Sequence, residues 1–93
     1  MIGTIRHKAL RQFFETGEAK GLPADLASRL KRMLSAMHAA EEVEQLGTIP
    51  GWRLHQLKGG RQGQWSLSVS GNWHLVFRWQ DGTANDVDFV DYH

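Results

Sequence analysis

Apolar residues recur at helical spacing through the first forty positions of the chain. Residues 8–16 form the first predicted helix, which Gly17 ends, and residues 24–40 form a longer one that starts after Pro23. A short strand over residues 2–5 precedes them. The apolar faces comprise Leu10, Phe13 and Phe14 in the first helix and Leu26, Leu30, Met33, Leu34 and Met37 in the second.

The hydrophobic period changes to two after the break at residues 47–51, which predicts strands in the second half. The clearest strands, 64–69 and 73–79, are joined by a three-residue link suited to a hairpin. Further strands are predicted over 52–58 and 86–92, the latter after an Asp81-Gly82 turn. The result is an α+β fold: a small antiparallel sheet of about four strands, with two N-terminal helices on one face and the other face open.

The chain has 93 residues, which is enough for one domain over 1–93 and too few for two. It contains no cysteine, so ordinary side-chain packing must stabilise it, and a reducing, cytoplasmic setting fits. It carries no signal-peptide pattern and no apolar run long enough for a membrane helix, so we expect a protein without membrane association. Motifs for metal, nucleotide and acyl-transfer sites are also missing, and no cofactor or metal is expected.

The net charge is only +1, but the charges are unevenly distributed. Residues 51–80 contain no Asp or Glu, and this segment predicts a phosphate-bearing ligand; a solvated basic sheet face explains the same pattern. The helix cations Arg29, Lys31 and Arg32 are expected to be solvated. The basic side chains of the segment are Arg53, His55, Lys58, Arg61, His74 and Arg78.

Strand pairing can bring His55 and His74 to the open sheet face together with Lys58 and Arg78. Cleavage of RNA by the ribose 2′-OH requires a base, an acid and cations for the phosphate oxygens, and these residue types supply them without metal. The glycine-rich segment 59–63 is expected to be a flexible turn in which Arg61 can touch phosphate. His7 and His38 lack such neighbours and are expected to be ordinary surface or partly packed residues.

The chain ends on Asp91, Tyr92 and His93, a carboxylate, a phenol and an imidazole. Imidazole has an ordinary pKa of about 6.5, so the trio suits acid–base chemistry. A frayed polar tail is the alternative. Tryptophans can stack on bases, but those of the predicted strands fall on the apolar phase and are expected in the core; they are Trp65, Trp73 and Trp79.

Four segments carry a resemblance to a known family: Gly51-Trp52-Arg53-Leu54-His55-Gln56-Leu57-Lys58-Gly59, Gly63-Gln64-Trp65-Ser66-Leu67, Gly71-Asn72-Trp73 and Val90-Asp91-Tyr92-His93. In order and spacing the chain resembles, over essentially its whole length, the HigB-type toxins of the RelE superfamily. The resemblance implies a toxin whose concave sheet face enters the ribosomal A site and cuts messenger RNA there without metal. It also implies a partner, a HigA-type helix-turn-helix antitoxin. The complex of toxin and antitoxin would bind operator DNA only through the antitoxin.

The resemblance further implies site residues. Its essential histidine falls on His55 and its terminal catalytic residues on Asp91, Tyr92 and His93. Lys58 matches a phosphate-binding residue, and Asn72 matches the asparagine of the hairpin. The departure is His74, where the family pattern leads us to expect an arginine that stabilises charge on the scissile phosphate. Compensation can come from Arg78 or Arg61, the other members of the expected RNA-binding set.

Two other readings stay open. The chain can be a binding module that occupies antitoxin or ribosome without cutting, in which case His74 marks the loss of activity. It can also be a nuclease of free RNA that needs no ribosome. The net charge of +1 disfavours this last reading, because it offers little general attraction for phosphate.

Overall fold

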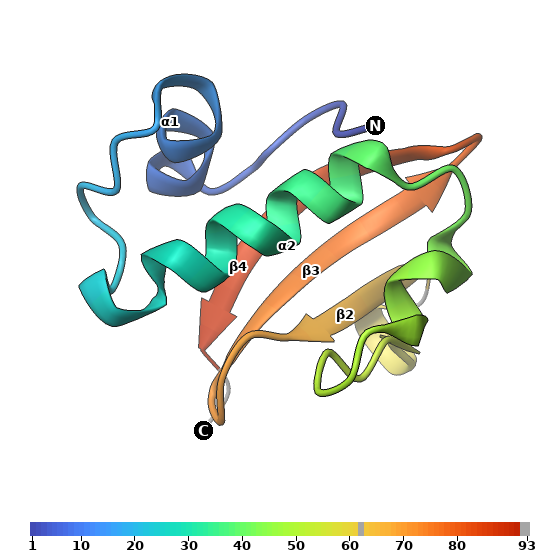
Figure 1. The fold of residues 1–93 in the computed structure, drawn as a ribbon. Helices are drawn as coiled ribbons and strands as arrows, with labels where there is room; N and C mark the ends of the chain where they lie inside the picture. Colours follow the sequence, from blue (N-terminus) through green and yellow to red (C-terminus); the bar gives the residue numbers. More distant parts are fainter. Residues whose placement is uncertain (62, 92–93) are drawn as a thin grey trace.

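The computed structural model describes residues 1–61 and 63–91, and has two layers. An antiparallel sheet of four strands in the order β1-β2-β3-β4 forms one layer, and α1 and α2 cover one of its faces (Figure 1). The predicted α+β arrangement is therefore confirmed. The bounds are Lys8–Thr16 for α1, Ala27–Ala39 for α2, His55–Gln56 for β1, Gln64–Ser68 for β2, Trp73–Gln80 for β3 and Thr83–Asp91 for β4.

Helix α1 has the predicted bounds, and a histidine caps its N-terminus. The Nδ1 atom of His7 accepts a hydrogen bond of 3.1 Å from the backbone N–H of Leu10. At the other end, Gly17 has a φ of 82° and donates its N–H to the Phe13 carbonyl. His7 is half-buried, in agreement with the expectation of an ordinary surface or partly packed residue, and its ring also replaces a missing helical partner. Phe14 remains 37% exposed at the edge of the predicted apolar face.

The second predicted helix is divided. A 3-10 turn, η1 (Ala24–Leu26), precedes α2, which ends one residue before the predicted boundary. A further 3-10 segment that the sequence pattern did not predict, η2 (Val43–Thr48), follows. The side chains of Glu42 and Gln45 form a capping box at its start. The residues of α2 that face the core are those predicted: Leu30, Met33, Leu34 and Met37.

The N-terminal segment runs beside β4 without forming a full strand. It makes isolated parallel bridges at Ile2 with Ala84 and at Ile5 with Val87, so the predicted strand 2–5 is only partly formed. The backbone N–H of Ile2 donates to Nδ1 of His38 at 3.1 Å. His38 is exposed, as expected, and its ring also ties the N-terminal segment to α2.

The two central strands and their hairpin agree with the prediction. Strand β4 begins at Thr83, three residues earlier than expected, because Asp81 and Gly82 form a two-residue turn with φ values of 52° and 75°. Positive φ at both central positions is typical of the type I′ hairpin turn. Strand β1 is much shorter than the predicted 52–58, since Arg53 has a φ of 48°, which interrupts extended structure just before His55.

The core lies between the helices and the sheet. Its largest fully buried side chains include Leu10 of α1, Met33 of α2 and Phe77 of β3. The strand tryptophans pack partly buried against this core, as predicted, and the Trp73 ring stacks on Phe89 with centroids 4.3 Å apart. Packing of the helices on one face leaves the opposite face of the sheet for function.

Candidate nucleic-acid interface

The face of the sheet turned away from α1 and α2 gathers most of the predicted site residues, and we call it the open face. Pairing places His55 opposite Ser66, Ser66 opposite Val76 and Val76 opposite Asp88 in one row across the sheet. Neighbouring rows follow from the same register, because residues two apart share a face. The remaining open-face residues are Gln64, Ser68, His74, Arg78 and Val90.

His55 is exposed on the edge strand β1. Its Nδ1 atom lies 3.0 Å from the backbone carbonyl oxygen of Arg53. A carbonyl oxygen only accepts hydrogen bonds, so Nδ1 carries the hydrogen and Nε2 of the neutral ring holds the lone pair. The hydrogen bond thus fixes the tautomer in which Nε2 can accept a proton.

His74 is half-buried on β3, and its Nδ1 atom lies 3.2 Å from the carbonyl oxygen of Asn72. It pairs with Ser68, whereas His55 pairs with Ser66 on the other side of β2. Two strand spacings and a two-residue step separate the histidines, which corresponds to roughly 12 Å between their Cα atoms. The predicted convergence on one face is confirmed, but at this separation the rings face different parts of a ligand.

The predicted cations lie toward the end of the open face away from the β2–β3 turn. Lys58 is exposed and lines a groove of about 350 Å³ formed by the end of β1 and the segment that leads to β2. Arg78 lies four residues along β3 from His74, and its Nε is 3.5 Å from a carboxylate oxygen of Asp86. Arg78 is therefore partly neutralised and distant from His74. Arg61 belongs to η3 (Gly59–Arg61), where a flexible turn was expected, and its side chain is outside the described part of the structure.

Asp91 lies on β4, at the other edge of the sheet from His55. Asp91 is the last residue of β4 and pairs with Trp73, beside the exposed Asn72 of the β2–β3 turn. In Figure 1 the end of β4 lies next to this turn. Asp91 is two residues after Phe89 in β4, so its side chain belongs to the helix-covered face of the sheet and not to the open face. Tyr92 and His93 lie outside the described residues, and their roles stay predictions.

Two polar groups of the open face are buried. Ser66 is fully buried. Among the described residues, neither Ser66 Oγ nor Gln64 Oε1 has a hydrogen-bond partner. Leaving such a group unpaired costs stability.

A second basic region borders the open face, and sequence reasoning missed it. Arg29 is exposed on α2, as expected, and its Nη1 also donates a 2.6 Å hydrogen bond to the carbonyl oxygen of Val69, just after the end of β2. Arg29, Arg53 and His74 line one shallow groove of about 360 Å³, which we call the arginine groove. No local sequence signal could reveal it, because helix packing brings residues from distant segments together. The other lining residues are Gly51, Ser68, Val69, Ser70 and Gly71.

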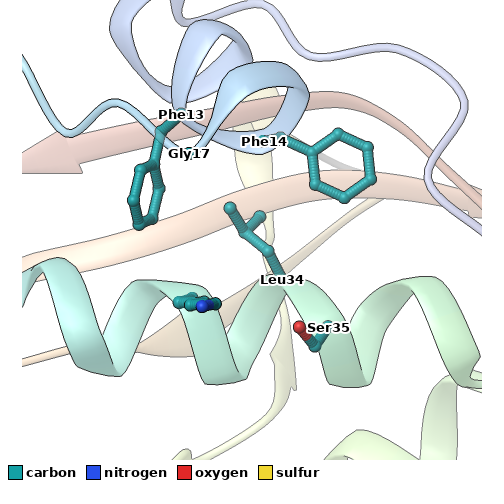
Figure 2. A pocket seen from close by; sticks show the side chains of 6 residues that line it. Phe13, Phe14, Gly17, Leu34 and Ser35 are labelled. Atoms are coloured by element: carbon teal, nitrogen blue, oxygen red, sulfur yellow. The ribbon is translucent and has the colours of Figure 1, made fainter.

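An apolar pocket of about 210 Å³ lies in the helical layer, between α1 and α2 (Figure 2). The rings of Phe13 and Phe14 extend from α1 on either side of it, and Leu34 of α2 points toward the space between them. Lys31 and Ser35 also line the pocket. It lies on the covered side of the sheet, remote from His55 and His74.

Within residues 1–61 and 63–91, no group of three or more His, Cys, Asp or Glu side chains is arranged to hold a metal ion. The helices of this same part also lack the length and hydrophobicity of a membrane span.

Comparison with known proteins identifies the family of the chain. Residues 3–93 match the family described as RelE-like toxin of type II toxin-antitoxin system HigB. The chain belongs to this family. It is 38% identical over 93 residues to Endoribonuclease HigB of Proteus vulgaris, covering 100% of both chains. It is 33% identical over 90 residues to Toxin HigB-1 of Vibrio cholerae serotype O1, covering 96% of this chain and 94% of that one.

Solved structures confirm the fold of this HigB-like toxin. A mutant of YafQ from E. coli is similar with a TM-score of 0.58 and 14% identity, over 98% of this chain and 91% of that one. A YoeB/ParE toxin from Agrobacterium tumefaciens gives a TM-score of 0.52 at 11% identity, over 98% and 99% of the two chains. Membership of a type II toxin-antitoxin family implies an antitoxin partner.

Proposed function

We propose that this toxin is an endoribonuclease that inhibits translation by cutting messenger RNA in the ribosomal A site. The observation that carries the proposal is the full-length identity of 38% to a protein named Endoribonuclease HigB. The histidines and cations of the open face support it, because they are the residue types that cleavage of RNA without metal requires.

The reaction we propose is attack by a ribose 2′-oxygen on the adjacent phosphorus. A base takes the 2′-OH proton, the 2′-oxygen bonds to phosphorus, the bond from phosphorus to the 5′-oxygen breaks, and an acid protonates that oxygen. His55 suits the base, because its Nδ1 hydrogen bond to Arg53 leaves Nε2 able to accept. His93 suits the acid, and Tyr92 positions substrate. Asp91 lies at the opposite edge of the sheet from His55, so the imidazole that it orients or charges is not that of His55.

Cations must then stabilise the negative charge that develops on the phosphate. Lys58 is an exposed candidate beside β1, and Asn72 is an exposed hydrogen-bonding group in the β2–β3 turn. His74 contributes positive charge only while it is protonated, unlike the arginine that the family pattern leads us to expect. The ribosome serves as scaffold, because the chain's net charge of +1 provides little general affinity for RNA.

We further propose that a HigA-type helix-turn-helix antitoxin neutralises the toxin, and that the complex meets operator DNA only through this partner. The support is the family description, which places the chain in a type II toxin-antitoxin system.

Cleavage of a defined messenger by purified protein with an untagged C-terminus tests the proposal. Reactions with and without programmed ribosomes should give cuts within A-site codons only when ribosomes are present. His93→Ala should abolish them. Cleavage of naked transcript at the same rate would contradict the ribosome requirement. Ribosome binding without cleavage would favour a binding module, and His74→Arg would then be the protein to test.

The product ends test the chemistry separately. Attack by the 2′-oxygen leaves a 2′,3′-cyclic phosphate, so a messenger with one 2′-deoxy nucleotide at the cut site should resist cleavage. A 2′-deoxy nucleotide in an adjacent codon serves as the matched control. Cleavage of the messenger substituted at the cut site at the parental rate would show that another nucleophile attacks.

A further inference from the structure

The arginine groove concentrates positive charge. Among residues 1–61 and 63–91, no Asp or Glu lines it, and the ion pair between Arg78 and Asp86 lies elsewhere. A neighbouring groove of about 390 Å³ shares Arg29, Gly51 and Ser68 with it and adds Arg32. Three guanidinium groups thus border one continuous depression between α2 and the end of β2.

One of these guanidinium groups is held in place. Arg29 uses one N–H for the Val69 carbonyl at 2.6 Å, which restrains the position of the group and leaves its other donors for a ligand. The backbone of Gly51 and Gly71 forms part of the wall, where no side chain would hinder an approaching anion. A restrained, planar guanidinium with spare donors matches the geometry of phosphate oxygens.

The groove opens directly onto the open face. Ser68 and His74 belong both to the arginine groove and to the open face. Arg53 is two residues from His55, and the backbone carbonyl of Arg53 accepts the hydrogen bond from the His55 ring. An extended RNA strand that contacted His55 and His74 would therefore reach Arg29 and Arg53 as it continued along this surface. This continuity favours a nucleic-acid backbone over an acidic protein segment.

We infer that the arginine groove is a binding site for an RNA phosphodiester that flanks the cut position, with Arg29 and Arg53 as its cationic ligands. The inference rests on the proposed function. It adds a phosphate-binding subsite at the end of the open face where His74 stands in place of an arginine.

Arg53→Gln is the cleanest test, because the Arg53 side chain is exposed and only its backbone carbonyl holds His55. Arg11→Gln, an exposed arginine of α1, is the matched control. The probe is a 2′-O-methyl RNA trinucleotide, which cannot be cut, titrated into the full-length protein at several salt concentrations. Arg53→Gln should weaken binding about tenfold and lower the slope of log affinity against log salt by about 0.7, the value for one lost phosphate contact to a single strand. Arg11→Gln should behave as the parent.

Cleavage on programmed ribosomes completes the test. Arg53→Gln should cut about tenfold more slowly, with Arg53→Lys restoring part of the rate. Parental binding and cleavage by Arg53→Gln would overturn the inference. So would unchanged cleavage with weakened neutralisation by antitoxin, because the groove would then bind an acidic protein segment. If the parent cuts nothing but the trinucleotide still needs Arg53, the proposed function fails while the subsite stands.

Discussion

At the scale of single residues, the histidines divide by the direction of their hydrogen bonds. His7 and His38 each accept a backbone N–H at Nδ1, which is a structural duty. His55 and His74 each place Nδ1 on a backbone carbonyl, which makes that nitrogen the donor in the neutral ring. Composition alone could not separate the two pairs, because the distinction depends on which backbone group each ring meets.

The capping role of His7 predicts a change in stability without a change in chemistry. His7→Ala removes the acceptor for the Leu10 N–H and the edge contact with the Phe89 ring, so the free energy of unfolding should fall by about 1 kcal/mol. His7→Asn, which keeps a capping oxygen, should lose less. Urea denaturation measures both variants. Reduced cleavage by folded His7→Ala protein would mean that His7 also serves the site.

Ser66 offers the opposite case of a buried polar group whose removal should stabilise. Its Oγ is fully buried without a partner among the described residues, so Ser66→Ala should raise the free energy of unfolding by about 1 kcal/mol. The half-buried Ser68→Ala should change it little. Thermal unfolding tests both. Cleavage should be unaffected by Ser66→Ala, and a large loss of rate would show that this hydroxyl becomes accessible to RNA.

At the scale of elements, the hydrophobic pattern predicted those helices and strands whose bounds depend on neighbouring residues in the sequence. The bounds of α1 follow from its apolar spacing and from Gly17, and the β2–β3 hairpin follows from strict alternation. The pattern predicted too long a strand at β1, which a left-handed backbone at Arg53 shortens, and it did not predict the 3-10 segment η2. Both errors lie in the connection between the helical and sheet halves, where long-range packing sets the backbone.

The β3–β4 turn gives a prediction at this scale. Gly82 has a φ of 75°, and an added Cβ would meet only the Glu41 carbonyl at 3.5 Å, an ordinary contact. Backbone strain therefore dominates the cost, and Gly82→Ala should lower the free energy of unfolding by about 1–2 kcal/mol. Gly82→Asn should cost less, because asparagine tolerates this region. Chemical denaturation of the two variants measures the difference, and an equal loss for both would point to the contact with Glu41 instead.

At the scale of the whole molecule, the helical layer stabilises the sheet and the open face presents the site. Sequence reasoning placed His55, His74 and Arg78 on that face, because alternation and strand order determine it. It could not anticipate the pairing of Arg78 with Asp86, nor the meeting of Arg29 with the end of β2. These contacts depend on a bulge in β4 and on the position of α2 across the sheet.

If the open face carries the chemistry, loss of His55 must slow the single-turnover cleavage of messenger on programmed ribosomes. The comparison is His55→Gln against the parent, with His7→Asn as the histidine control from the helical layer. His55 is exposed, so His55→Gln should keep the parental free energy of unfolding within about 0.5 kcal/mol. It should cut at least about a hundredfold more slowly, as expected for loss of a general base, while His7→Asn cuts normally. A parental rate from folded His55→Gln protein would show that His55 is not the base and that the chemistry lies elsewhere.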